Sequence, residues 1–133
     1  MAAVLEGYPA SVRAHMLALR ALIYQLADES QAGPVEESLK WGEAAYRAPQ
    51  GSTVRMAWQA ETPQLFGLYF ICTTSLLDTF KMLYGDLLRF EGNRAILLEA
   101  DAPLPIEELK TCLTLALTYH QRKRLPLLGA HAA

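Results

Sequence analysis

The segment from residue 35 to residue 71 constrains the fold more than any other part of the sequence. It is rich in β-branched and aromatic residues, and three short stretches, "WG", "APQGS" and "ETPQ", interrupt it. Glycine and proline supply the backbone angles that turns need, so the pattern is typical of consecutive short strands. The turns are too short for crossover helices, so neighbouring strands must run antiparallel. We predict strands over residues 36–41, 44–48, 53–59 and 65–71.

Helical periodicity precedes and follows this strand segment. We predict a first helix over residues 9–30 and a second over residues 75–85, where Ser75 and Asp78 form a capping-box-like start. A third helix is predicted over residues 105–124, because acidic residues in its first turn and basic residues in its last turn complement the helix dipole. The apolar stripe of the first helix consists of Val12, Met16, Leu19, Ile23 and Leu26.

The stretch "LLRFEGNRAILLEA" predicts a β-hairpin, because two apolar runs flank a turn in which Gly92 and Asn93 both tolerate positive φ. The predicted order of elements is therefore α-β-β-β-β-α-β-β-α. This order favours the α+β class, with helices on one face of a largely antiparallel sheet of about five to six strands. A chain of 133 residues suits one domain, with a core at about residues 8–122 and a C-terminal tail at 123–133.

Composition and charge argue against several classes of partner. The chain has 12 basic and 14 acidic residues, which is not the basic footprint of a nucleic-acid-binding protein. Its longest apolar run is about eight residues, far short of the ~20 that span a bilayer, and "MAAVLEGYPA" does not resemble a secretory signal. Cys72 and Cys112 lie in apolar segments, which predicts two buried thiols in a reducing cytoplasm. We expect a cytoplasmic protein that binds neither nucleic acid nor membranes.

The sequence also bears on oligomeric state and on catalysis. Its hydrophobic share is 52%, slightly above the usual ~45–50%, which indicates a subunit interface and a homodimer. Catalytic signatures are missing: there is no glycine-rich phosphate loop, no HExxH, no CxxC and no nucleophile elbow. The leading hypothesis is therefore a non-enzymatic binding module for a small ligand or a protein, and an enzyme of unidentified class stays as an alternative.

The stretch "LKWGEAAYR" offers the best candidate binding residues. Neighbours on a strand point to opposite faces, so Trp41 shares a face with Leu39, while Lys40 shares the other with Ser38. Trp41 is either a core residue or one wall of an aromatic pocket with a polar rim. The predicted ligand-binding residues are Lys40, Trp41, Tyr46, Tyr69 and Arg89.

Several stretches of the chain together resemble the YdhG-like domain family over about residues 8–122: "YPASVRAHMLALRALI", "ESLKWGEAAY", "LFGLYF" and "LLRFEGNRAILLEADAPLPIEELK". This is a small bacterial α+β family of unknown function, some of whose members are described as frataxin-like iron chaperones. The resemblance implies a compact sheet covered by helices and, as an alternative function, iron binding and delivery.

Hard iron prefers oxygen ligands, which directs the iron hypothesis to carboxylates. Frataxin-type binding uses an acidic ridge along the first helix, whereas here that helix carries Arg13, His15 and Arg20. Acidic residues occur only at its end and on the strands that follow. The candidate iron ligands are Asp28, Glu29, Glu36, Glu37 and Glu43.

Overall fold

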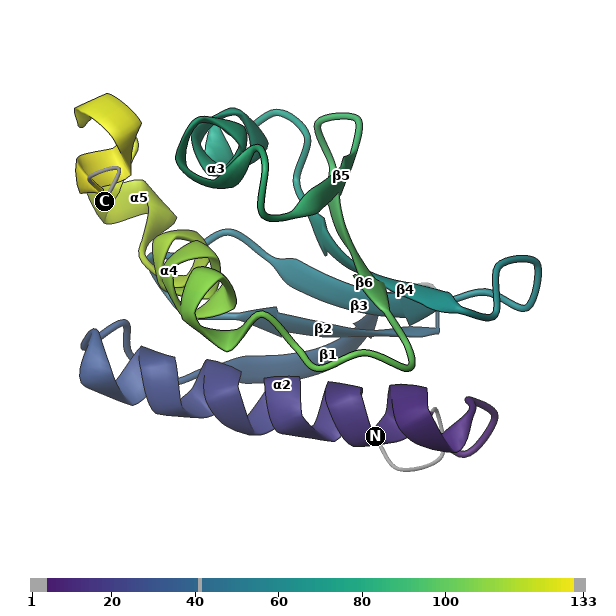
Figure 1. The fold of residues 1–133 in the computed structure, drawn as a ribbon. Coiled ribbons are helices and arrows are strands. Elements are labelled where there is room, and N and C mark those ends of the chain that lie inside the picture. Colours follow the sequence, from purple (N-terminus) through teal and green to yellow (C-terminus); the bar gives the residue numbers. More distant parts are fainter. Residues whose placement is uncertain (1–4, 41, 131–133) are drawn as a thin grey trace.

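The computed structural model describes residues 5–40 and 42–130, which form an α+β fold. Its centre is a six-stranded sheet in the order β1-β2-β3-β4-β6-β5, and every neighbouring pair is antiparallel (Figure 1). The predicted class, the antiparallel pairing and the hairpin are confirmed. The strands are β1 (Glu36–Lys40), β2 (Glu43–Arg47), β3 (Val54–Trp58), β4 (Leu65–Phe70), β5 (Arg89–Glu91) and β6 (Ala95–Glu99).

Helices cover one face of this sheet (Figure 1). Ring contacts place two of the helices against the sheet. His15, from the helix over residues 10–29, stacks on Phe66 with ring centroids 5.7 Å apart, and Phe80, from the helix over residues 76–84, meets Phe70 edge-on at 5.1 Å. The helix over residues 106–117 packs between these two helices. The predicted apolar stripe of the first helix is buried, as its spacing indicated. The three helices are α2 (Ala10–Glu29), α3 (Leu76–Tyr84) and α4 (Ile106–Leu117).

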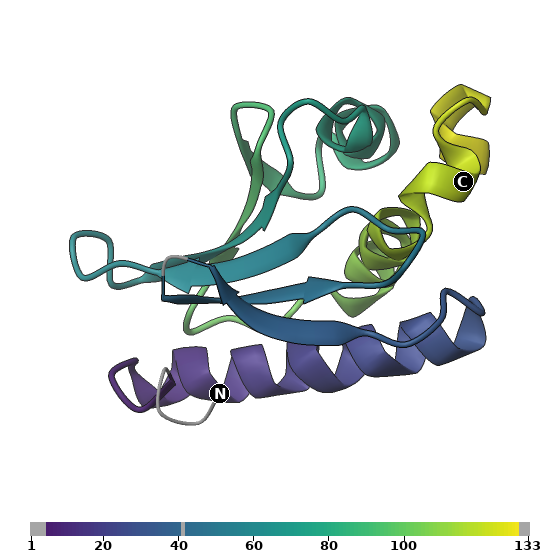
Figure 2. The same cartoon turned by 180° about the vertical axis from the view of Figure 1, so that it is seen from behind.

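The sheet has a covered face and an open face. On the covered face, under the helices, Tyr46 lies opposite Val54, and Val54 lies opposite Phe70. The neighbouring row of residues points the other way, because successive side chains alternate along a strand. That row contains Ala45, Arg55 and Tyr69, and it defines the open face, over which no helix of the described residues lies (Figure 2).

The predicted third helix is broken at Thr118, so its predicted extension to residue 124 is wrong. The helix α4 ends at Leu117, and a short helix α5 (Tyr119–Arg122) and a 3-10 turn η1 (Pro126–Gly129) follow it. The cause is the loop between β2 and β3, which docks on the break. The backbone N–H of Ser52 donates to the carbonyl of Ala116 at 2.8 Å, and the N–H of His120 donates to Gln50 at 2.8 Å. In a continuous helix, the N–H of His120 would donate to the carbonyl of Ala116, and both of these groups instead bond the loop.

Two local predictions need correction, one on the capping of α3 and one on Cys72. Ser75 precedes α3 as expected, but its side chain makes no capping hydrogen bond. The predicted hairpin turn is present, and Gly92 adopts a positive φ of +55° in it. Cys112 is buried as predicted, whereas Cys72 is exposed, because the chain leaves β4 two residues before it.

Among the described residues, no helix combines the length and the apolar character that crossing a membrane requires.

Candidate binding surface on the open face of the sheet

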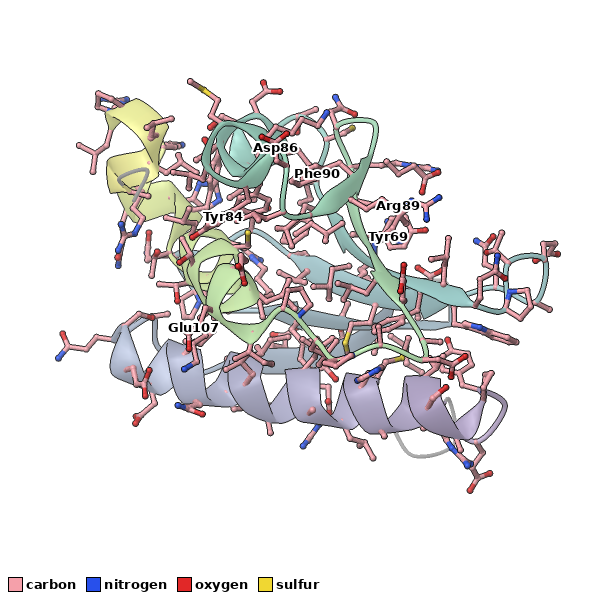
Figure 3. All side chains as sticks on the ribbon, in the orientation of Figure 1. Tyr69, Tyr84, Asp86, Arg89, Phe90 and Glu107 are labelled. Atoms are coloured by element: carbon pink, nitrogen blue, oxygen red, sulfur yellow. The ribbon has the colours of Figure 1, made fainter. Side chains whose placement is uncertain are left out.

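Three of the five predicted ligand-binding residues lie on the open face, but only Tyr69 and Arg89 are neighbours there, since Lys40 and Arg89 belong to the two opposite edge strands, β1 and β5. Lys40 lies opposite Glu43, and Tyr69 lies opposite Arg55, both in rows that point away from the helices. Arg89 lies opposite Leu97 on the same face. Figure 3 shows the side chains of Tyr69 and Arg89 close together on the side of β5 and β6 that faces away from α3 and α4. The prediction for Trp41 lies outside the described residues.

Tyr46 lies on the covered face, apart from the other predicted ligand residues. It is fully buried, and its ring meets that of Tyr24 from α2 edge-on, with centroids 6.3 Å apart. Burial raises the pKa of its hydroxyl, and the neighbouring Glu37 carboxylate raises it further. The structure therefore places Tyr46 in the core, where it cannot meet a ligand on the open face.

The ring of Tyr69 is the centre of the open face. The guanidinium carbon of Arg55 lies 5.6 Å from its centroid, and that of Arg94 lies 5.8 Å from it. Each arginine also holds a carboxylate: Arg55 bonds Glu43 at 2.6 Å, and Arg94 bonds Glu91 at 3.1 Å. Burial raises the pKa of the Tyr69 hydroxyl, and Glu91 adds to that shift. Two guanidinium groups thus contact one aromatic ring at the surface of the sheet.

A hollow of about 390 Å³, which we call the cationic hollow, opens beside these groups. Its basic lining comes from Lys40, Arg55 and Arg94, and the other lining residues carry no formal negative charge. The turn between β5 and β6 is held at its rim, because the side-chain amide of Asn93 donates to the carbonyl of Cys72 at 3.4 Å. The remaining lining residues are Thr53, Phe70, Ile71 and Cys72. The hollow therefore combines positive charge with an apolar floor.

A second hollow of about 400 Å³, the groove, lies on the other side of Arg94, which lines both. Its lining includes the small residues Ala57 and Gly67 and the side chains of Tyr69 and Arg89. A methyl group on Gly67 would lie 2.6 Å from Cε1 of Tyr69, so the ring folds back over that glycine. Tyr69 covers Gly67 in the way that aromatic residues protect glycines in sheets.

The five candidate iron ligands do not come together. Glu36 and Glu37 are neighbours on β1 and point to opposite faces. Glu37 accepts a 2.6 Å bond from Arg20, which lowers the pKa of this carboxyl group, and Glu43 is bonded to Arg55. Asp28 and Glu29 are exposed at the end of α2. Over residues 5–40 and 42–130, no group of three histidine, cysteine or acidic side chains could hold a metal ion.

The sequence prediction missed Arg55 and Arg94. Arg55 could have been found, because the alternation in "VRMAW" places it on the face opposite Val54 and Met56. Arg94 follows a hairpin turn, and the direction of its side chain depends on the conformation of that turn.

The fold places this chain in the α+β class. Comparisons with protein-family models, with curated proteins and with solved structures gave no match. The resemblance to YdhG-like domains stays a prediction.

Proposed function

We propose that this protein is a binding module whose open sheet face holds a small organic anion with an apolar body. The observation that carries the proposal is the cationic hollow, where Lys40, Arg55 and Arg94 surround an apolar floor. A ligand with a carboxylate, sulfonate or phosphate group would meet these cations. Its apolar part would lie against Ile71, which is 45% exposed.

The charges that line the cationic hollow favour an anion over a cation. Lys40, Arg55 and Arg94 line it, whereas the carboxylates that bond these arginines, Glu43 and Glu91, are not among its lining residues. Arg55 and Arg94 are held in place by their ion pairs and by the ring of Tyr69, so fewer rotamers are lost when they bind a ligand. An anionic group can share a guanidinium that already bonds one carboxylate, because arginine has five N–H donors.

The experiment is a fluorescence titration with anilinonaphthalene sulfonate, which joins an anionic group to an aromatic body. Arg94→Gln should weaken binding about fivefold to tenfold, since a charge-assisted contact worth roughly 1–1.4 kcal/mol is lost. Lys81→Gln is the matched control, because Lys81 is an exposed cation on α3, away from the open face. Phenylnaphthylamine, the same body without the sulfonate, should bind more weakly and respond little to Arg94→Gln.

Added salt should weaken binding of the sulfonate, because exposed charges are screened. Equal affinities for the sulfonate and for the neutral probe would contradict an anion site in the cationic hollow. So would an equal loss of affinity for the sulfonate in Arg94→Gln and in Lys81→Gln.

A further inference from the structure

The strand β1 forms one edge of the sheet, and among the described strands it pairs with β2 alone. An edge strand leaves a row of main-chain N–H and C=O groups without a partner strand, which can pair with another chain. In an antiparallel hairpin closed by a two-residue connection, the two residues that flank the connection exchange both of their main-chain hydrogen bonds. Along the two strands, pairs of opposite residues that are hydrogen-bonded then alternate with pairs that are not. Lys40 and Glu43 are the two residues that flank the connection. The main-chain groups of Glu37 and Leu39 therefore point away from β2, toward the free edge.

The side chains of β1 are complementary to a second copy of the same strand. Two copies that pair antiparallel about a twofold axis at Ser38 place Glu36 of one copy opposite Lys40 of the other, twice. In this register, Glu37 of one copy exchanges main-chain bonds with Leu39 of the other. These are the residues whose main-chain groups point outward, so the side-chain match and the backbone match agree.

The charges also continue beyond the two edge strands. Within one chain, Glu36 lies opposite Arg47, and Lys40 lies opposite Glu43. Across the join, each row on the open face would read Arg47, Glu36, then Lys40 and Glu43 of the second copy. The signs alternate along the whole row, which is the favourable arrangement for cross-strand pairs.

Other registers lose this match. Centring the pair on Glu37 places two Glu37 carboxylates opposite each other, and centring it on Leu39 places Lys40 opposite Ser38. Charged residues on an edge strand commonly prevent pairing with arbitrary strands. Here like charges oppose the register centred on Glu37, the register centred on Leu39 lacks the two Glu36–Lys40 pairs, and the register centred on Ser38 keeps both.

We propose that β1 is a self-association site, through which two copies of this chain join their sheets into one continuous antiparallel sheet with Ser38 at the twofold axis. The pairing covers Leu39, which is 54% exposed in the single chain. Two five-residue strands bury less than the ~1,200 Å² of the smallest stable interfaces, so the dimer forms in a concentration-dependent equilibrium. This proposal does not depend on ligand binding, and Arg94→Gln should leave it unchanged.

Sedimentation equilibrium over a concentration series tests the proposal. The mass of the parent should rise from 14.8 kDa toward twice that value. Glu36→Lys and Lys40→Glu should each weaken association at least about tenfold, because like charges then face each other across the join. The double variant should regain part of this loss, since opposite charges again face each other across the join, although each reversed charge now lies opposite a like charge, Arg47 or Glu43, in its own chain. Circular dichroism confirms that each variant is folded. A parent that stays monomeric throughout, or single variants that associate like the parent, would overturn the proposal.

Cysteine crosslinking tests the register separately. In a Cys72→Ser background, oxidised Ser38→Cys should form a covalent dimer, because the Cα atoms of directly opposite residues in an antiparallel pair lie within disulfide range. Leu39→Cys should not, since Leu39 faces Glu37 of the second copy. Crosslinking of Leu39→Cys in preference to Ser38→Cys would show that the register is wrong.

Discussion

The covered and open faces of the sheet are made by the same strands but are protected from water in different ways. On the covered face, large side chains such as Leu68 and Ile96 are fully buried beneath the helices. On the open face, the buried residues are small, and Ala45, Ala57 and Ala95 have at most 4% exposure without any described helix above them. Longer neighbours such as Tyr69 shield this face. A layer of side chains can rearrange around a ligand more easily than a packed helix, so the open face is the more suitable one for binding.

The largest predicted effect separates two neighbours on β4. Leu68→Ala should lower the free energy of unfolding by about 2–5 kcal/mol, because it leaves a cavity under the helices. Tyr69→Ala should cost no more than about 1–2 kcal/mol, because its ring is half-buried on the open face and water can fill the space. Urea denaturation of both variants gives the two values. Similar losses at both positions would mean that the open face contributes to the core as much as the covered face.

The sequence predicts much of this division, because alternation within a strand is a local property. The alternation of Val54, Arg55 and Met56 assigns faces without any knowledge of the fold. Relating one strand to the next requires the register. Tyr46 and Tyr69 were predicted to share a binding region, yet Tyr46 lies opposite Val54 and Tyr69 opposite Arg55, so they point to opposite faces. A shift of one residue in pairing would have reversed that result.

Long-range contacts account for the other differences. Nothing near Thr118 in the sequence indicates that the last helix stops there, because the break results from hydrogen bonds to Gln50 and Ser52. The position of Arg94 depends in the same way on a turn held against Cys72 by Asn93. Periodicity within one segment does not report such contacts.

The second prediction compares two carboxylates on β1. Arg20 lowers the pKa of Glu37 on the covered face below its ordinary value of 4.5. The ionised form is therefore favoured in the folded state, and its stabilising contribution is present above about pH 4.5 and is lost as the pH falls through the lower, folded-state pKa. In Glu37→Gln, the free energy of unfolding should therefore fall less between about pH 5 and pH 2 than it does in the parent. Glu36→Gln, on the exposed side of the same strand, is the control.

Urea denaturation between about pH 5 and pH 2 measures both profiles, at concentrations where light scattering gives a monomer. If Glu36→Gln reduced the loss of unfolding free energy at low pH as much as Glu37→Gln, the ion pair between Glu37 and Arg20 would not be the cause of that pH dependence.

A third prediction uses two glycines that have equally close neighbours of different kinds. A methyl group at Gly67 would lie 2.6 Å from the ring of Tyr69, and one at Gly51 would lie 2.6 Å from the carbonyl oxygen of Leu117. The ring is the end of a flexible side chain and can move, so Gly67→Ala should change stability by less than about 1 kcal/mol. The carbonyl belongs to the backbone at the helix break, so Gly51→Ala should cost about 1–3 kcal/mol.

Thermal unfolding ranks the two glycine variants, and the ring resonances of Tyr69 in NMR spectra should shift in Gly67→Ala alone. A larger loss in Gly67→Ala than in Gly51→Ala would indicate that the open face is rigidly packed.

The smallest predicted effect on stability concerns the two cysteines. Cys72 is exposed in the cationic hollow, whereas Cys112 is buried in α4, where burial raises the pKa of its thiol to about 12. Thiolates are the reactive form of cysteine, so dithiobis(nitrobenzoate) should modify one thiol per folded chain and two after unfolding. Because Cys72 lies outside the core, its modification should leave the unfolding temperature nearly unchanged. The attached nitrobenzoate carries an anionic group and an aromatic ring into the cationic hollow, so it should also reduce binding of anilinonaphthalene sulfonate. Rapid modification of both thiols in the folded chain would show that the covered face opens as readily as the open face, and the contrast between the two faces would then not hold.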